Sequence, residues 1–498
     1  MNASTRANSR FTHKGFHGVL HTFFPVAHAP LEPLKKQYGD CFSRTLFFVH
    51  DDYVDWYWDA HEMDRIGRDV IERASRDRLF LPRLLRQWHG LVQKFEKQIH
   101  RVEKTVLAPL SNTQLLELYA EFYDAYVAEF GLALSLQDPF SMHADTLVEP
   151  PLKRFLQSKG LSAKFNEIYA VLFAPVKPSF IAREYEDLLR IALTIHRRRA
   201  AEKLKKDPHT LKTYPAIERL LRRHSQRYFW ICNNYAKTPV LRVNDFLQRA
   251  LDEKDPARAL HHHGEELKKN RHYKTAVSRK LKLPPEIKTL VQIGETFSYM
   301  QDERKKYVLI SNHYQNRFLK EIARRTGWPL GELQYVTFPE LAGVLNGTFD
   351  RKEAQQRRRF CLCLQTPGHW QIISGQEAQD VYQHNFEEKK AGADVLHGTC
   401  ANPGYATGPV KIIRKTHDLV NMKTGDVLVA SMTRPEMLIA MKKAAAIVTD
   451  EGGITSHAAV VSRELGIPCL IGTKTASTWL KDGQKVEVNA SQGCIKKI

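Results

Sequence analysis

A histidine that closely follows two glycines is the residue of this sequence best placed to do chemistry. His457 ends the run GGITSH (452–457), which comes soon after a short β-type run, AIVT (446–449). Glycines lack a Cβ, so they allow a tight turn and a close approach of the backbone to a ligand. We expect Thr455 to cap a helix that starts here. His457 would then lie in its first turn, where unpaired N–H groups and the helix dipole favour a bound phosphate.

Histidine suits the transfer of a phosphoryl group. Its neutral form is available near pH 7, and one ring nitrogen can attack phosphorus. The phosphoramidate bond formed in this way is labile, so the group can be passed on. Arg463 lies six residues further along the helix, where it could hold the phosphate or the surface that docks at each active site. Gly466 and Pro468 are expected to end this helix.

Three consecutive stretches carry a resemblance to a known family. GGITSHAAVVSR (452–463) closely resembles the phosphorylation-site signature of the phosphoenolpyruvate-utilising enzymes, which include phosphoenolpyruvate synthase, pyruvate phosphate dikinase and rifampin phosphotransferase. ELGIPCLIGT (464–473) continues the resemblance. ASMTRPEMLIAMKKAAAIVTDEGG (430–453) is similar to the family segment that contains a Thr-x-Pro motif. The resemblance implies a swivelling domain with His457 as the catalytic residue, and a phosphate-binding loop and helix formed by Gly452, Gly453, Thr455, Ser456 and Arg463.

The resemblance also implies a reaction in two halves. His457 would take a phosphoryl group from ATP, yielding AMP and phosphate, and pass it to a hydroxyl or enolate of a small molecule. The chain contains no recognisable ATP-grasp segments, and it ends at Ile498 without the phosphoenolpyruvate-binding barrel of the dikinases. We therefore expect ATP and Mg²⁺ to be bound by a separate ATP-grasp subunit, as in phenylphosphate synthase. No metal ligands are assigned within this chain.

A looser resemblance covers the region upstream of the swivelling domain. Residues 302–345 look similar to the helical region of rifampin phosphotransferase, and the similarity extends over about 180–385. In that enzyme the helical domain holds the phosphoryl acceptor, which implies an acceptor pocket among these helices. The role of residues 1–180 and the identity of the acceptor stay open.

Two other function classes compete with a phosphoryl carrier. One is a non-catalytic regulator that keeps the swivelling domain as an adaptor and binds a ligand or RNA, but such a protein would not need His457 in its full loop. The other is a complete enzyme with an unrecognised ATP site in residues 1–180. The low glycine content of that region disfavours this alternative.

Composition narrows the class of protein. The 498 residues are 43% hydrophobic and carry a formal charge of +20, without a recognised nucleic-acid motif, so nucleic acid is not the expected partner. We interpret the basic residues of two segments as solvent-exposed helix faces: RRRAAEKLKKD (197–207) and RLLRRHSQR (219–227). No apolar run approaches the roughly 18 residues of a membrane helix, and a cytoplasmic protein without a membrane partner is expected.

Cysteine and histidine clusters give no metal site. The seven cysteines form no C-x-x-C pair and are expected to be reduced thiols. Cys361 and Cys363 alternate in a run typical of a strand. The run 261–263 is all histidine, but it lies in a charged, loop-like stretch without partner ligands.

The fold class expected is multidomain: a large, mostly α-helical N-terminal region followed by a compact α/β (β/β/α) domain. Residues 391–498 hold 11 of the 26 glycines, and this rise in glycine content marks a domain boundary. We expect a helical region with short strands at 1–180, a helical domain as the candidate acceptor-binding domain at 181–384, a hinge at 385–397 and the mobile phosphohistidine domain at 398–498.

Helical periodicity supports the N-terminal half of this division. Apolar residues at spacings of three and four predict buried stripes over 84–106, 115–130 and 302–327. Ser111 and Gln114 form a capping-box signature. In the aromatic-rich stretch 44–62, which could begin as a strand, four side chains are expected in the core or around an apolar pocket: Phe47, Phe48, Trp56 and Trp58.

Short runs predict the elements of the C-terminal domain. Strands are expected at 408–413, 426–430, 446–449, 467–471, 485–488 and 494–496, and helices at 436–443 and 455–465.

Overall fold

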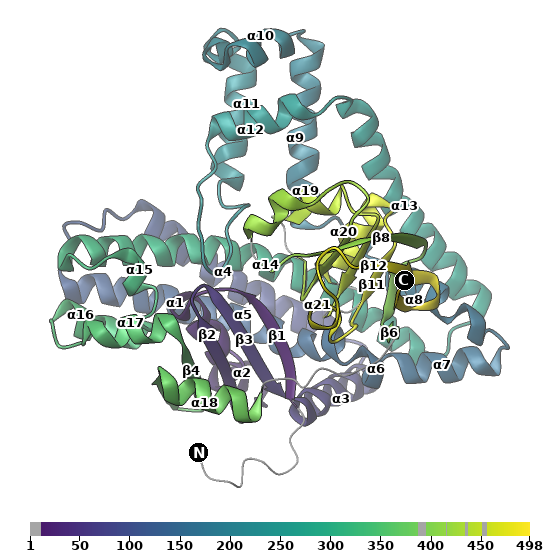
Figure 1. Ribbon diagram of the computed structural model, residues 1–498, viewed down its shortest axis with the longest axis horizontal. Coiled ribbons are helices and arrows are strands. Elements are labelled where there is room, and N and C mark those ends of the chain that lie inside the picture. Colours follow the sequence, from purple (N-terminus) through teal and green to yellow (C-terminus); the bar gives the residue numbers. More distant parts are fainter. Residues whose placement is uncertain (1–10, 387–394, 415, 434–436, 451–455) are drawn as a thin grey trace.

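The computed structural model describes residues 11–386, 395–414, 416–433, 437–450 and 456–498. Figure 1 shows a helical body that carries one sheet, a helical arm that projects from it, and a C-terminal α/β domain beside the body. This architecture confirms the predicted fold class.

The first sheet joins the two ends of the N-terminal region. Its order is β1-β3-β2-β4-β5, and every neighbouring pair is antiparallel. Because β2 pairs with β4, residues 361–374 complete a sheet begun by residues 11–59. The expected division at 180/181 therefore cuts through one shared sheet and core. The strands are β1 (Phe11–His17), β2 (Thr45–His50), β3 (Tyr53–Asp59), β4 (Cys361–Thr366) and β5 (His369–Ser374).

Aromatic side chains hold this sheet against the helices. Phe47, Trp56 and Trp58 are almost completely buried in the main core, whereas Phe48 faces the other side and packs against α18. Cys361 and Cys363 are buried in β4, as predicted for a strand with small side chains.

Three long helices form the centre of the body. α4 (Phe80–Lys104), α5 (Asn112–Met142) and α14 (Pro285–Thr326) pack on one another. The predicted stripes on α4 and α5 are buried, and the capping box at Ser111 is present. Val106 is an exception, because it lies beyond α4 and is 69% exposed.

Two helix limits differ from the prediction. α5 runs through Gly131, where a Cβ would come within 2.5 Å of the carbonyl oxygen of Ala29, so this glycine permits a close helix contact rather than ending the helix. α14 starts at Pro285, well before the predicted start near residue 302, and ends as predicted at Gly327 in the left-handed region.

Shorter helices complete the body. They are α1 (Leu20–His28), α2 (Glu32–Tyr38), α3 (Ala60–Arg76), α6 (Ala144–Leu147), α7 (Glu149–Ser158), η2 (Ser162–Lys164), α8 (Phe165–Leu172), α13 (Pro256–Leu281), α15 (Leu330–Leu333), η4 (Phe338–Glu340), α16 (Leu341–Leu345), α17 (Arg351–Arg359) and α18 (Gln376–Asn385). The histidines at 261–263 lie within α13, so the loop expected there is wrong. Asp255 caps this helix and Pro256 occupies its first position, which are ordinary helix-start features.

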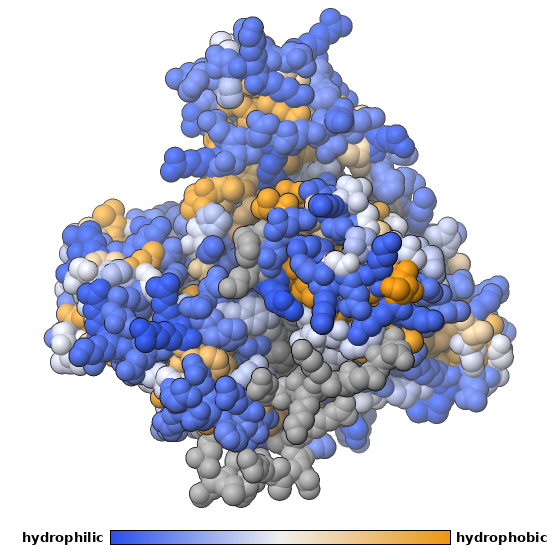
Figure 2. Space-filling model, viewed as in Figure 1, coloured by the Kyte–Doolittle hydropathy of each residue, from blue (hydrophilic) through white to orange (hydrophobic). Residues whose placement is uncertain are grey.

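The arm has a small core of its own. It consists of α9 (Phe180–Arg197), α10 (Ala201–Lys206), η3 (Pro208–Thr213), α11 (Pro215–Tyr228) and α12 (Val243–Asp252). The basic segments 197–207 and 219–227 both belong to it, and their lysine and arginine side chains are exposed. The end of the arm is accordingly hydrophilic in Figure 2.

The C-terminal domain is built on an eight-stranded sheet with the order β6-β13-β12-β8-β9-β10-β11-β7. The central strands β8 to β11 are parallel, and the remaining pairs are antiparallel. The elements are β6 (Val395–His397), β7 (Thr399–Asn402), β8 (Tyr405–Ile412), η5 (Thr416–Asn421), β9 (Val427–Ala430), α19 (Leu438–Met441), β10 (Ala446–Thr449), α20 (His457–Leu465), β11 (Cys469–Ile471), α21 (Ala476–Trp479), β12 (Lys485–Asn489), η7 (Ala490–Gln492) and β13 (Cys494–Lys497).

The start of this domain differs slightly from the prediction. Residues 395–397 were expected in the hinge, but they form β6 and pair with β13. At the other end of the expected hinge, Asn385 is the last residue of α18 and the ring of Phe386 packs 4.6 Å from that of Tyr57. Residues 387–394 lie outside the described residues.

Candidate functional site

The helix predicted to carry the reactive histidine is α20. His457 is its first residue, and its N-cap is Ser456, whose Oγ accepts a hydrogen bond from the backbone N–H of Ala459 at 3.3 Å. The cap was expected one residue earlier, at Thr455. Serine is preferred over threonine at the N-cap, so the better capping residue of the two takes this position.

Part of the predicted loop lies outside the described residues. This applies to Gly452, Gly453 and Thr455, and to the side chain of His457. The described parts are the strand β10 that leads into the loop and the helix α20 that leaves it. α20 ends at Gly466, which has a φ of 68°. His457 therefore lies where the N–H groups of a first turn lack intrahelical partners.

Arg463 lies in the last turn of α20, away from His457. Its Nε donates to the carbonyl oxygen of Ala401 in β7 at 2.8 Å. Burial lowers the pKa of its guanidinium to about 10. In this arrangement Arg463 joins α20 to β7, and the structure does not bring it together with the N-terminus of α20.

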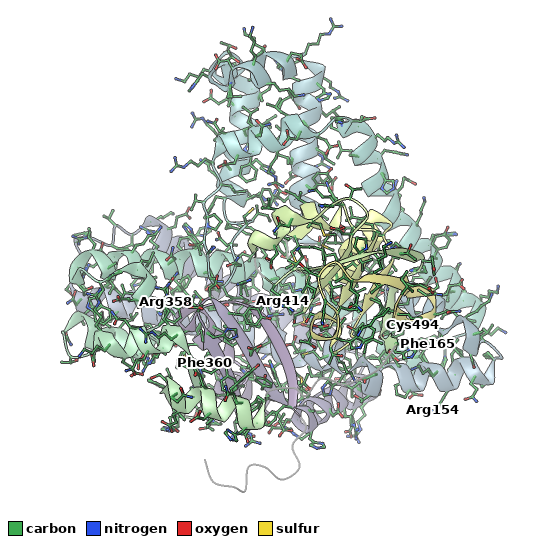
Figure 3. All side chains as sticks on the ribbon, in the orientation of Figure 1. Arg154, Phe165, Arg358, Phe360, Arg414 and Cys494 are labelled. Carbon is green, nitrogen blue, oxygen red and sulfur yellow. The ribbon has the colours of Figure 1, made fainter. Side chains whose placement is uncertain are left out.

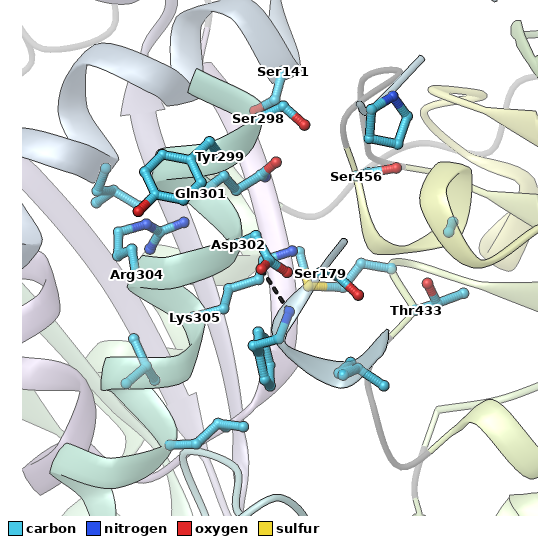
Figure 4. Close-up of a pocket in the computed structure, with 18 of the residues that line it drawn as sticks. Ser141, Ser179, Ser298, Tyr299, Gln301, Asp302, Arg304, Lys305, Thr433 and Ser456 are labelled. Atoms are coloured by element: carbon cyan, nitrogen blue, oxygen red, sulfur yellow. Dashed lines mark hydrogen bonds between the residues drawn. The ribbon is translucent and has the colours of Figure 1, made fainter. Parts of the chain in front are cut away.

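A pocket of about 370 Å³ lies between the C-terminal domain and the helical body. Ser456, Ala458 and Val461 of α20 line one side, together with Met432 and Thr433 after β9. Residues 173–181 and one face of α14 line the opposite side. Figure 4 shows Ser456 and Thr433 across the pocket from Asp302 and Arg304.

Most of the pocket wall is apolar. Phe23, Trp56, Phe130, Phe173 and Phe180 contribute aromatic side chains from the body. Trp56 is thus both a core residue and a pocket residue, and both places had been expected for the aromatic side chains of 44–62. Phe173 can pack closely against α14 because Gly294 has no Cβ, which would otherwise lie 2.6 Å from its ring.

Asp302 and Glu295 are acidic residues on the body side of the pocket, and Glu295 pairs with Lys274 at 2.9 Å. The other contacts and the pKa of Asp302 set it apart. Its Oδ2 accepts a hydrogen bond from the backbone N–H of Phe180 at 2.7 Å and lies 4.0 Å from Nη2 of Arg183. Burial, with a smaller contribution from the neighbouring Glu303, raises the pKa of Asp302 to about 7. A carboxyl group with such a pKa can accept a proton near neutral pH.

A second helix starts at the pocket. Ser179 is the N-cap of α9, and its Oγ accepts from the N–H of Ala182 at 3.0 Å. The N-termini of α9 and α20 therefore both border the pocket, from different domains. Lys177 and Lys305 add positive charge to its lining, and the ammonium group of Lys177 lies 4.1 Å from the ring centre of Tyr299.

Sequence reasoning missed residues 177–181 and Asp302 as site residues. A usable signal was present in the first group, because Pro178 and Ser179 precede the apolar Phe180 as they do at many helix starts. Asp302 was marked only as a helix position. Its contact with Phe180 joins residues far apart in the sequence, so no local pattern predicts it.

Polar contacts join the C-terminal domain to the body on one side. Thr399 Oγ1 donates to Glu149 at 3.1 Å, Asn166 Nδ2 donates to the carbonyl oxygen of Ser491 at 3.0 Å, and Lys474 lies 3.5 Å from Asp145. Figure 3 labels Phe165 and Cys494 at this contact, beside Asn166 and Ser491.

A further contact lies on the other side of the domain. His17 Nε2 donates to the carbonyl oxygen of Arg414 at 2.5 Å, and Figure 3 shows Arg414 near β1. Two apolar side chains, Met432 and Leu438, also pack against the body and the arm.

The described residues contain neither a cluster of metal ligands nor a helix that could span a membrane. Among the described residues, no three His, Cys, Asp or Glu side chains are grouped so that they could hold a metal ion. Within the same residues, every helix is too short or too polar to cross a membrane.

Comparison with known proteins identifies the C-terminal domain. The family model of the PEP-utilising enzyme mobile domain matches residues 422–493. A probable phosphoenolpyruvate synthase of Methanothermobacter thermautotrophicus is 50% identical over 108 residues, which is 22% of this chain and 16% of that protein. The phosphoenolpyruvate synthase of Pyrococcus furiosus is 51% identical over 111 residues, or 22% of this chain and 14% of that protein.

A third relative matches over a longer stretch. The protein named uncharacterized phosphotransferase YvkC, of Bacillus subtilis, is 42% identical over 166 residues, which is 33% of this chain and 19% of the relative. The chain thus spans less than a fifth of each of these relatives. The domain that begins with β6 and contains α20 is a mobile domain of the PEP-utilising enzymes.

Proposed function

We propose that this chain carries a phosphoryl group on His457 and delivers it to a hydroxyl or enolate acceptor bound in the pocket between the two domains. One observation carries the proposal: Ser456 and Ala458, the neighbours of His457 on both sides, line that pocket. The names of the relatives support phosphoryl transfer in general. The assignment to His457 rests on its position at the start of α20.

The transfer step can be written with this chain's own residues. An oxygen of the phosphoryl acceptor attacks the phosphorus, and the P–N bond to phosphohistidine 457, whose other ring nitrogen carries a proton, breaks. The electron pair of this bond returns to the ring nitrogen, so that His457 leaves as neutral imidazole. Where the acceptor is a hydroxyl, its proton passes to the carboxylate of Asp302. Positioning of the reacting groups and neutralisation of charge dominate such a step, and the N-terminus of α20 and the pocket lysines Lys177 and Lys305 would provide the positive field.

The first half of the reaction belongs to a partner in this proposal. ATP and Mg²⁺ would be bound by an ATP-grasp subunit of the phosphoenolpyruvate synthase type, because the described residues offer no cluster of metal ligands. Phosphoryl transfer from ATP requires a metal and a clamp of donors around the phosphates. The C-terminal domain would swing between that partner and the pocket, turning about the segment between α18 and β6.

The test is transfer of label from ATP that carries radioactive phosphorus at the β position. The chain alone with Mg²⁺ should stay unlabelled, and addition of an ATP-grasp partner should give an acid-labile, base-stable label. His457→Ala should abolish it. His397→Ala is the matched control, because His397 lies on the exposed β6 of the same domain, and this variant should be labelled like the natural chain.

Two results would contradict the proposal in different parts. Label that persists in His457→Ala would show that another residue carries the phosphoryl group. Stoichiometric labelling of the natural chain without a partner would show that the chain contains its own ATP site and needs no ATP-grasp subunit.

A further inference from the structure

Arg304 is a buried cation without a polar partner in the described part of the chain. It lies on α14, is 5% exposed and lines the interdomain pocket. It makes no hydrogen bond or ion pair with any described residue, and its Nε is completely buried. Its guanidinium instead lies over the ring of Phe130, 4.7 Å from the ring centre. Buried arginines are normally paired, so this one requires an explanation.

Two other buried polar atoms of the same pocket share this property. Gln301 Oε1 and Asn233 Oδ1 have no hydrogen-bond partner among the described residues. The amide of Asn233 is held in place by its Nδ2, which donates to the carbonyl oxygen of Leu309 at 2.9 Å. A buried donor and two buried acceptors therefore border one cavity, and the acceptor of Asn233 is held in place; this is the pattern of a polar ligand site.

Glu129 is the acid that could otherwise neutralise Arg304. Burial raises the pKa of Glu129 to about 8, against the opposing effect of Arg304. Its Oε1 accepts from the indole N–H of Trp88 at 3.1 Å, and its Oε2 has no hydrogen-bond partner among the described residues. Near neutral pH the protonated form predominates, so the positive charge of Arg304 is available to a ligand.

We infer that Arg304 binds an anionic group of the phosphoryl acceptor, and that the acceptor is a hydroxylated carboxylic acid with an apolar body. Arginine binds a carboxylate through paired N–H donors. The aromatic wall fits the apolar body, and a cavity of about 370 Å³ has room for more than a two- or three-carbon acid. Gln301 and Asn233 supply acceptors for hydroxyl groups of the ligand.

This inference names the substrate class and rests on the proposed function for the transfer step, but binding can be tested without transfer. Benzoate and benzyl alcohol are suitable probes, because they share an aromatic ring and differ in the carboxylate. Titration calorimetry of the unphosphorylated chain should show that benzoate binds at least about tenfold more tightly than benzyl alcohol. Equal affinities, or no benzoate binding at millimolar concentration, would overturn the inference.

Substitution of the arginine gives the second comparison. Arg304→Met should weaken benzoate binding at least about tenfold and leave benzyl alcohol unchanged. Arg324→Met is the matched control, because Arg324 is an exposed arginine of the same helix that pairs with Glu321, and it should change neither affinity. Unchanged benzoate binding in Arg304→Met would refute the role of this residue.

If Arg304→Met binds neither benzoate nor benzyl alcohol, the pocket has collapsed. Arg304→Lys then tests whether the positive charge at this position selects benzoate. A lysine keeps the charge, so benzoate should again bind more tightly than benzyl alcohol; if it does not, the inference fails. His457→Ala should bind benzoate like the natural chain. Selective benzoate binding in a chain that never accepts label would refute the proposed function and leave the anion site intact.

Discussion

The two helix N-termini at the pocket differ in what their positive ends face. α9 belongs to the arm and presents its first N–H, that of Phe180, to the carboxylate of Asp302. α20 belongs to the mobile domain and has no acidic residue in its first turn. Each begins with a serine cap, so their backbones are prepared in the same way. The N-terminus of α9 faces a carboxyl group of this chain, whereas in the proposed function the N-terminus of α20 faces a phosphoryl group that is taken up and released.

The same contrast holds for the two pocket walls. The body contributes Asp302, Arg304 and two lysines, together with large aromatic side chains. The mobile domain contributes small or aliphatic side chains around the start of α20. In the proposed function the body therefore recognises the acceptor and the mobile domain delivers the phosphoryl group, so variants on the two sides should fail in different steps.

The largest effect is expected from changing one residue on each wall. His457→Ala should abolish labelling from ATP and a partner, whereas Arg304→Met should be labelled to the natural extent and then fail to discharge to 4-hydroxybenzoate. The reason is that only the first variant lacks the nucleophile. Label retained on protein and product formed are the two measurements. Failure of Arg304→Met to become labelled would contradict the separation of roles.

Asp302→Asn should come next, with discharge slowed by about 10²- to 10⁴-fold and labelling unaffected, because a general base contributes roughly that much. Since the pKa of Asp302 is raised to about 7, discharge by the natural chain should increase as pH rises through 7. Glu286→Gln, which removes an exposed carboxylate of the same helix, should leave the profile unchanged. A rate independent of pH between 6 and 8 would exclude Asp302 as the base.

The same substitution should also change the pH dependence of stability. A carboxyl whose pKa is raised on folding stabilises the folded state while protonated, and this contribution is lost as pH rises from its unfolded value toward about 7. Asp302→Asn should therefore gain stability relative to the natural chain between pH 5 and pH 8. The gain should be about 3 kcal/mol at most, because only the two pH units between pH 5 and the pKa of about 7 contribute. Denaturant titration at the two pH values measures this. A gain that shrinks with rising pH would contradict the shifted pKa.

The serine caps should give smaller and separable effects. Ser179→Ala and Ser456→Ala should each cost about 1 kcal/mol, since a capping hydrogen bond is lost, and the glycine variants should cost only a few tenths. Hydrogen exchange should locate the first loss in α9 and the second in α20. Ser456→Ala should still accept label. Exchange that increases equally in both helices would mean that the two caps are coupled.

The smallest effect should come from the polar contacts that join the domains. Lys474→Gln removes a solvent-exposed ion pair with Asp145, which is worth less than about 1 kcal/mol. Limited proteolysis should cut the natural chain first between Asn385 and Gly398, and this variant should be cut at nearly the same rate. A cut elsewhere, or complete resistance of this segment, would count against an independently moving domain.

Local patterns predicted much of the fold. The buried stripes of α4 and α5, the capping box at Ser111 and six strands of the mobile domain, β8 to β13, follow from periodicity and turn residues, which act over a few positions. β6 and β7 were not predicted. The loop expected around 261–263 was wrong because charge was taken as a sign of irregular structure. The cap at Asp255 and the proline after it were the better signal.

The candidate site could be predicted only in part. Motif and resemblance marked His457 and the helix behind it, because these residues are adjacent in the sequence. Arg304 and Asp302 could not be found in this way, since a pocket between domains depends on how they dock. The placement of Arg463 shows the same limit: its carbonyl partner, Ala401, lies on a strand 62 residues earlier.

The pairing of β2 with β4 has a consequence for synthesis of the chain. The ribosome adds roughly 310 residues between His50 and Cys361, which takes about 15 to 60 s at the usual rate of about 5 to 20 residues per second. During that time β2, which carries the apolar residues Leu46, Phe47 and Phe48, lacks its partner strand β4 on one edge. We therefore expect a chaperone at the ribosome to cover this unpaired edge until β4 has been synthesised.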